Sequence, residues 1–242
     1  MSVESAGKMY GFVYDGTYKE EDFNITVNEN GKKTYELKPG VPKFKDGCQP
    51  GDPKYKNIDG SEDNLITDND RTVIGNGHPL HTGGFTNNFV YKNWDLNIFL
   101  QWSYGNDVFN VNRLVMENPG AKKQLNQFAS YKNRWSESNP TSNIPRVRAV
   151  GADEYSSLYV EDGSFLKLKT ISLGYNFDTK TLKRIGLSAA RVFVSAENIA
   201  TITGYSGSDP EVSTRHSVLT PGFDWSAYPR AFNASLGVNV TF

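Results

Sequence analysis

The last fourteen residues, Pro229 to Phe242, place the strongest constraint on what this chain can fold into. From Phe232 to Phe242 every second residue is apolar, and the residues between them are Asn, Ser, Gly or Thr. Because side chains alternate between the two faces of a strand, this pattern predicts a β-strand with one apolar and one polar, uncharged face. A strand of this kind, about 10 residues long, is the repeating unit of transmembrane β-barrels, and the strands of soluble β-sandwiches have a similar pattern.

The composition is compatible with such a strand in either a transmembrane β-barrel or a soluble β-sandwich. Mean hydropathy is -0.55, and no run approaches the length of about 18 apolar residues that a membrane helix needs. Aromatic residues make up 13% of the chain, which fits the aromatic girdles of a membrane barrel. Net charge is -1 and no basic stripe or recognition motif is present, so nucleic acid is not an expected partner.

A second clear pattern covers residues 83–104. Phe85, Phe89 and Tyr91 share one parity in the first half. After the polar pair Lys92-Asn93, the even positions from Trp94 to Tyr104 are all apolar or aromatic. The sequence therefore predicts an antiparallel hairpin with a tight turn at residues 92–93.

Further strands are expected on both sides of this hairpin. Residues 164–177 and 190–200 alternate, and the leucines Leu166 and Leu168 lie on the opposite parity to Ile171 and Leu173, which predicts a β-bulge near Thr170. Residues 10–18 are aromatic and suited to a strand, whereas residues 20–60 are polar and are expected to form a long, exposed and partly ordered loop. Residues 121–135 have apolar spacing that suggests a short helix.

The connections between these strands alternate in length. Short links follow the strands that end near residues 91 and 177, and long loops at 105–163 and 201–228 follow the others. Short turns on one side and long loops on the other are typical of outer-membrane barrels. We therefore expect an all-β, antiparallel transmembrane β-barrel with long extracellular loops, in which residues 1–81 form a loop region and residues 82–242 carry the barrel strands.

The number of strands sets a further expectation. About five strands cannot close a barrel, because bacterial barrels have at least eight. An open edge in lipid would leave backbone groups unpaired at a cost of several kcal/mol each. Residues 1–7 are polar and do not resemble a secretory signal, so the chain is expected to be the C-terminal part of a larger protein or else a cytosolic protein.

Several stretches resemble one family, the SusC/RagA-type TonB-dependent transporters of Bacteroidetes outer membranes. The resemblance covers most of the chain in order, and its segments are 10–18 (Y-G-F-V-Y-D-G-T-Y), 66–75 (I-T-D-N-D-R-T-V-I-G), 82–105 (with T-G-G-F and Q-W-S-Y-G), 159–175 (Y-V-E-D-G-S-F-L-K-L-K-T-I-S-L-G-Y), 191–211 (ending in G-Y-S-G-S-D-P-E) and 228–242. It corresponds to roughly the last quarter of such a transporter.

The resemblance implies active uptake of nutrients too large for porins, commonly oligosaccharides and sometimes peptides. It implies a location in the bacterial outer membrane, in contact with lipid, and a barrel of about 22 strands. It also implies a SusD-like lipoprotein as partner and TonB as the energy source, engaged through an N-terminal part that this chain lacks. The terminal Phe242 resembles the signal that the barrel-assembly machinery reads.

Residues 59–70 (D-G-S-E-D-N-L-I-T-D-N-D) have the spacing of a calcium loop. Oxygen donors occupy positions 1, 3, 5, 7, 9 and 12 of an EF-hand-like loop: Asp59, Ser61, Asp63, the Leu65 carbonyl, Thr67 and Asp70. Asn64 replaces the usual glycine at position 6, and Asp70 replaces the usual glutamate at position 12. Calcium is thus a possible cofactor, and the alternative is an acidic, solvated loop.

Other candidate chemistry is sparse. His78, His81 and His216 have no cysteine or carboxylate at metal-ligand spacing and are read as loop histidines. The nucleophile-elbow and phosphate-loop motifs are absent, and Asp209 and Glu211 lie in loop-like sequence, so no enzymatic activity is expected.

Two questions remain open at this level. Arg191 and Glu197 are expected on the polar face, where they would contact solute or plug, or form an ion pair in the wall. The second function considered is a soluble β-rich carbohydrate-binding or adhesin domain, which would bury the apolar strand faces against a second sheet.

Overall fold

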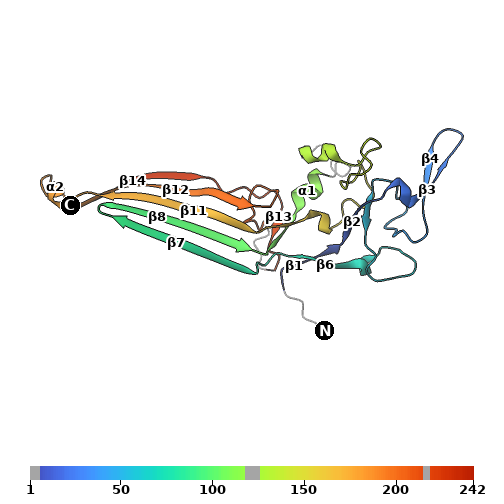
Figure 1. Ribbon diagram of the computed structural model, residues 1–242, viewed down its shortest axis with the longest axis horizontal. Coiled ribbons are helices and arrows are strands. Elements are labelled where there is room, and N and C mark those ends of the chain that lie inside the picture. Colours follow the sequence, from blue (N-terminus) through green and yellow to red (C-terminus); the bar gives the residue numbers. More distant parts are fainter. Residues whose placement is uncertain (1–5, 118–125, 215–218) are drawn as a thin grey trace. The chain divides into compact units, whose positions relative to one another are not determined.

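The computed structural model describes residues 6–117, 126–214 and 219–242 and is built mainly from β-strands (Figure 1). The strands are β1 Lys8–Phe12, β2 Tyr14–Thr17, β3 Phe23–Val27, β4 Lys33–Leu37, β5 Pro53–Tyr55, β6 Arg71–Asn76, β7 His81–Tyr91, β8 Trp94–Tyr104, β9 Asp107–Asn110, β10 Val160–Asp162, β11 Phe165–Asn176, β12 Ala189–Thr203, β13 Phe223–Asp224 and β14 Asn233–Thr241. The helices are α1 Val111–Met116 and α2 Thr179–Lys183, with 3-10 turns at Glu20–Asp22, Asp68–Asp70, Ala129–Asn133 and Ser157–Tyr159. Among these residues no helix has both the length and the apolar character needed to cross a membrane.

The chain divides into two compact units. The first combines Met1–Gly77, Val108–Glu161 and Val212–Ser226, and the second combines His78–Asp107, Asp162–Glu211 and Ala227–Phe242. The second unit contains the long strands, which form one antiparallel sheet in the order β14-β12-β11-β8-β7 (Figure 1). The hairpin predicted over residues 83–104 is present as β7 and β8, and its turn is Lys92-Asn93.

The register of this sheet gives it two chemically different faces. One row of paired residues crosses all five strands and is wholly apolar: Leu236, Val194, Leu173, Leu96 and Phe89. The adjacent row on the other face is wholly polar: Ser235, Ser195, Ser172, Asn97 and Asn88. On the apolar face Leu236 is 78% exposed and Phe89 is 56% exposed, so nothing in the described chain buries these side chains.

A β-bulge keeps the apolar face continuous along β11. The register of β11 against both of its neighbours shifts between Leu168 and Thr170. Because Lys169 is left out of the pairing, Leu168 faces the same side as Ile171, although the two residues have opposite parity. The bulge predicted near Thr170 is therefore confirmed.

Glycines on the polar face make room for long side chains of neighbouring strands. A Cβ at Gly174 of β11 would collide with the guanidinium of Arg191 from β12, and a Cβ at Gly237 of β14 would collide with the Phe193 ring. Gly174 pairs with Asp95 of β8, so the Arg191 side chain crosses over β11 to reach that carboxylate. The sheet thus carries an interaction between strands that are not adjacent.

The first unit has small aromatic cores. Phe12 and Tyr55 are buried with Ile66, and a second cluster joins Tyr18, Phe23 and Cys48. The hairpin of β3 and β4 packs against the second cluster through Tyr35 and Leu37. Residues 20–60, which were expected to form a long, exposed and partly ordered loop, are largely exposed and contain β3, β4 and β5, and the contacts among Tyr18, Phe23 and Tyr35 order part of this segment.

The structure also differs from the expected strand and helix ends in places. The strand-like stretch 10–18 is split into β1 and β2, which pair with β6 and β5 respectively. Within the expected helix 121–135, residues 121–125 lie outside the described residues and residues 129–133 form a 3-10 turn. Helix α1 was not expected, and it begins after Asn110, whose side chain accepts a hydrogen bond from the Arg113 amide.

The crossing of Arg191 over Gly174 can be tested by adding one methyl group. We expect Gly174→Ala to lower the free energy of unfolding of the intact protein by about 1–3 kcal/mol, because the methyl displaces the guanidinium from Asp95. The control is Gly204→Ala, where a Cβ would meet no atom within 4 Å and the change should stay within about 0.5 kcal/mol. Urea unfolding measures both, and equal unfolding midpoints for the two variants would contradict the crossing.

Candidate functional site

The polar face of the sheet carries a charged cluster near its short-turn end. Arg191 donates to both oxygens of Asp95, with Nε–Oδ1 at 3.2 Å and Nη2–Oδ2 at 2.5 Å. Asn176 Nδ2 also donates to Asp95 Oδ1, at 2.9 Å. Arg191 is thus ion-paired with Asp95 of β8 and not with Glu197, and this bidentate geometry fixes three strands relative to one another. Contact of Arg191 or Glu197 with solute or plug stays a prediction.

A second cluster lies toward the long-loop end of the same sheet. Lys167 of β11 is 4% exposed, and its Nζ lies 2.7 Å from Asp209 Oδ1 and 3.1 Å from Glu211 Oε2. Glu211 also contacts Lys169 Nζ at 3.4 Å and Arg230 Nη2 at 3.0 Å. One network of five charged residues thus joins β11 to residues 209–211 and to Arg230. Its members are Lys167, Lys169, Asp209, Glu211 and Arg230.

The network anchors the segment 204–211 that follows β12. Burial raises the pKa of the Asp209 carboxyl, but hydrogen bonds from Lys167 and from the Glu211 and Arg230 amides outweigh it and hold that pKa below its ordinary value. Asp209 therefore stays ionised opposite the buried ammonium. The sequence placed Asp209 and Glu211 in a loop without a catalytic role, and their ion pairs were not predicted because nothing in the sequence places that loop next to Lys167.

The expected calcium loop is folded around one aspartate. Asp70 is 0% exposed, and its two carboxylate oxygens accept hydrogen bonds from the amides of Ile58, Asp59 and Thr67 at 2.7, 3.1 and 2.8 Å. Burial raises the pKa of the Asp70 carboxyl, and these three amides more than offset it, so the pKa is lowered. Asn64 adopts a left-handed backbone with φ 53°, as position 6 of such a loop would need.

The other acidic residues of this loop make local turns. Asp59 Oδ1 accepts from the Ser61 amide at 2.8 Å, and Asp63 Oδ1 accepts from the Leu65 amide at 3.0 Å. In the part of the chain that the structure describes, no three His, Cys, Asp or Glu side chains are grouped closely enough to hold a metal ion. Calcium binding by Asp59, Ser61, Asp63, Leu65, Thr67 and Asp70 stays a prediction.

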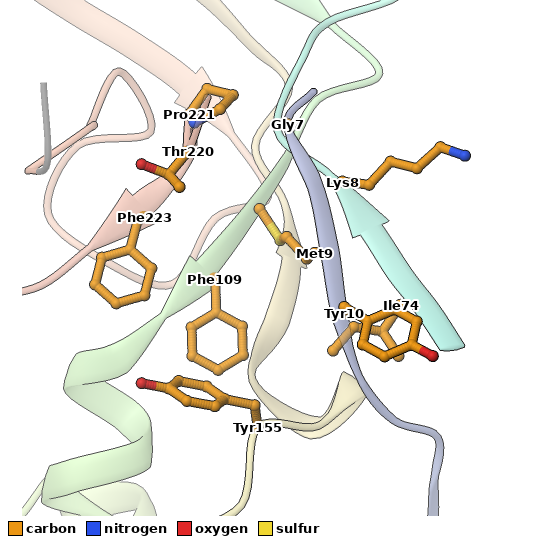
Figure 2. A pocket seen from close by; sticks show the side chains of 10 residues that line it. All are labelled: Gly7, Lys8, Met9, Tyr10, Ile74, Phe109, Tyr155, Thr220, Pro221 and Phe223. Atoms are coloured by element: carbon orange, nitrogen blue, oxygen red, sulfur yellow. The ribbon is translucent and has the colours of Figure 1, made fainter. Parts of the chain in front are cut away.

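A cavity of about 240 Å³ lies in the first unit, and sequence reasoning did not anticipate it (Figure 2). Its aromatic wall consists of Phe109, Phe223 and Tyr155. The Phe109 and Phe223 rings stack at 6.0 Å between centroids, and Phe109 and Tyr155 lie 5.2 Å apart. Met9 and Ile74 from the β1-β6 pair form part of the opposite wall (Figure 2).

The remaining residues singled out in the sequence have separate positions. His81 is the first residue of β7, stacks on Tyr104 at 5.2 Å and accepts a hydrogen bond from Trp102 Nε1 at 3.2 Å. It therefore belongs to a strand and not to a loop. His216 lies outside the described residues. Phe242 follows β14 and is 89% exposed, and its role as an assembly signal stays a prediction.

The anchoring role of Asp70 can be measured locally. We expect Asp70→Ala to accelerate amide hydrogen exchange in residues 57–70 of the intact protein at least about tenfold, since the amides of Ile58, Asp59 and Thr67 lose a charged acceptor. The pKa of the Asp70 carboxyl is lower in the folded protein than in the unfolded chain. The protection should therefore be complete above about pH 4, and it should be lost as the pH falls through the folded-state pKa. The control is Asp68→Ala, whose side chain is 88% exposed, and comparable exchange in both variants would contradict the role.

The anchor at Lys167 can be tested by proteolysis. We expect Lys167→Met to expose segment 204–211 to chymotrypsin at Tyr205, because the buried Asp209 carboxylate loses its cation. Adding Asp209→Asn should restore part of the resistance by removing the unpaired charge. Lys183→Met, on the exposed face of α2, should be cleaved no faster than the unaltered protein, and resistance of Lys167→Met would refute the anchor.

The sequence relatives of this chain share one description, TonB-dependent receptor. TonB-dependent receptor P3 of Formosa agariphila is 33% identical over 99% of this chain, and TonB-dependent receptor P26 of the same organism is 34% identical over 79%. TonB-dependent receptor SusC of Bacteroides thetaiotaomicron is 30% identical over 66% of this chain. No protein-family model matches the chain.

The fold has a matching neighbour among solved structures. A structure of the RagAB peptide transporter superposes with a TM-score of 0.68 and 22% identity, over 97% of this chain and 23% of that one. The present chain covers 22% of receptor P3 and 15% of SusC, so it spans about a fifth of the length of these relatives. The sequence relatives, together with the two-faced antiparallel sheet, identify the chain as a member of the SusC/RagA-type TonB-dependent receptors of the bacterial outer membrane.

Proposed function

We propose that this chain forms part of the wall and outer loops of a TonB-dependent transporter that imports large nutrients across the outer membrane. The observation that carries the proposal is the two-faced sheet β14-β12-β11-β8-β7, which is apolar on one side and polar on the other. A barrel wall between lipid and an aqueous interior needs these two faces.

The apolar face has the extent that a bilayer requires. β7 and β8 each contain 11 residues, and at about 3.3 Å per residue with a tilt of about 45° such a strand crosses about 25 Å. A soluble carbohydrate-binding or adhesin sandwich would cover this face with a second sheet. The high exposure of Leu236 and Phe89 favours lipid as its environment instead.

The polar face suits the interior of a transporter. The Asp95–Arg191 pair and the Lys167 network would be strongly disfavoured in hydrocarbon, and both lie on the side opposite the apolar row. The charged residues of both clusters are ion-paired, so neither cluster presents an isolated charge to a passing solute.

We expect both edge strands of the sheet to pair with further strands. β14 and β7 are the edge strands of the five-stranded sheet. An open edge in lipid is unfavourable, so strands from the rest of the transporter are expected to pair with both edges and close the barrel. By the family resemblance, Phe242, which follows β14, is proposed to act as the signal for barrel assembly.

The substrate and partners are proposed from the relatives. One structural neighbour is described as a peptide transporter, which supports peptides as an imported class, and the resemblance to the SusC/RagA-type transporters extends the proposal to oligosaccharides. By the same analogy a SusD-like lipoprotein assists capture on the cell surface, and TonB supplies energy through a part of the protein outside this chain. We propose no enzymatic step.

Uptake by intact cells tests this function. We expect deletion of the gene to abolish growth on at least one member of a panel of oligosaccharides and oligopeptides, with loss of TonB having the same effect. A plasmid copy of the intact gene should restore growth, and the corresponding monosaccharides and amino acids should support both strains. Unimpaired growth on the whole panel, or recovery of the protein in the soluble fraction, would contradict the proposal.

A further inference from the structure

The cavity of the first unit has walls that are fixed by backbone contacts. The Tyr155 carbonyl accepts a hydrogen bond from the Phe12 amide at 3.0 Å, and the Gly222 carbonyl accepts one from the Phe109 amide at 2.7 Å. Gly11 faces the Tyr155 carbonyl and Gly77 faces the Pro221 carbonyl so closely that a Cβ would not fit at either position. The segments that carry Tyr155 and Phe223 are thus tied to β1, β6 and β9, and the cavity is largely preformed.

The lining of the cavity is apolar and aromatic. Met9, Ile74, Phe109 and Phe223 contribute hydrocarbon, sulfur and ring surface, and the exposed rings of Tyr10 and Tyr155 stand at its margin. Figure 2 shows the Lys8 side chain extending away from the Phe109 and Tyr155 rings, so its ammonium does not point into the space between them. The cavity therefore offers contact area rather than charge.

The lining distinguishes between the two proposed substrate classes. Sugars present several hydroxyls that need hydrogen-bonding partners, since a buried polar group without a partner is costly. Among the described residues that line the cavity, the polar side-chain groups are the hydroxyls of Tyr10, Tyr155 and Thr220 and the Lys8 ammonium, which extends away from the rings. None of these residues has a carboxylate, a carboxamide or a guanidinium, the groups that could satisfy two sugar hydroxyls at once. A volume of about 240 Å³ is also below the range of about 300–1,000 Å³ usual for whole small-molecule ligands, so it suits one side chain of a larger substrate.

We propose that this cavity is a subsite for one apolar side chain, aromatic or branched aliphatic, of a peptide substrate. The inference rests on the proposed transport function and narrows its substrate class. Phe109 and Phe223 bind the inserted ring or branch by face and edge contacts, and the Tyr155 ring adds to the same aromatic wall. The peptide backbone stays outside the cavity, so the subsite selects for residue type at one position and tolerates varied sequences elsewhere.

Ligand-observed NMR with the purified intact protein tests the subsite directly. The probes are N-acetyl-phenylalaninamide, N-acetyl-glycinamide and maltose, each at millimolar concentration. We expect saturation transfer to the phenylalaninamide ring protons and little to the other two probes. Tyr155→Ala should weaken the ring signal at least about threefold, and Thr220→Phe, which places a ring in the cavity, should abolish it.

A matched control separates the cavity from nonspecific contact. Tyr228→Ala removes a tyrosine that is 91% exposed and does not line the cavity, and it should leave the ring signal unchanged. A ring signal of equal size in all variants, or a stronger signal from maltose than from phenylalaninamide, would overturn the proposal. Cells that import oligopeptides normally while the protein gives no cavity-dependent signal would refute the subsite and leave the transport function intact.

Discussion

Strict alternation of side chains across one antiparallel sheet is the constraint on which the rest of this structure depends. Five strands keep a common register, so that apolar rows such as Leu236-Val194-Leu173-Leu96-Phe89 all lie on one side. A shift of one residue in any strand would move its apolar set to the polar face. The bulge between Leu168 and Thr170 allows β11 to obey this rule although its sequence changes parity.

The polar face shows how the sheet is reinforced without a packed second layer. Arg191 reaches Asp95 across Gly174, and buried Lys167 ties Asp209 and Glu211 to β11. Both interactions bring together residues far apart in the sequence, and both are placed away from the apolar face, where unscreened charge is disfavoured. The same sheet therefore separates two environments and anchors a surface segment.

Sequence alone predicted the parts that follow from local periodicity. The hairpin of β7 and β8, the final strand and the bulge in β11 could be read from parity, since each depends only on the spacing of apolar residues. The role of Asp209 and the cavity around Phe109 could not, because they depend on contacts between distant segments. The hairpin of β3 and β4 was not read from the sequence because its strands are short, at 5 residues each, and lie within a polar stretch. The aspartates of residues 59–70 were singled out by spacing, but the closure of that loop around Asp70 needed coordinates.

The central claim is that one face of this sheet contacts lipid and the other contacts water. Spin-label accessibility along β14, with Cys48 replaced by serine and single cysteines placed from Ala234 to Thr241 in the membrane-embedded intact protein, tests it most directly. We expect a period of two, with even positions accessible to oxygen in the bilayer and odd positions accessible to an aqueous nickel complex. Aqueous accessibility at every position, or even positions shielded from both reagents, would contradict it.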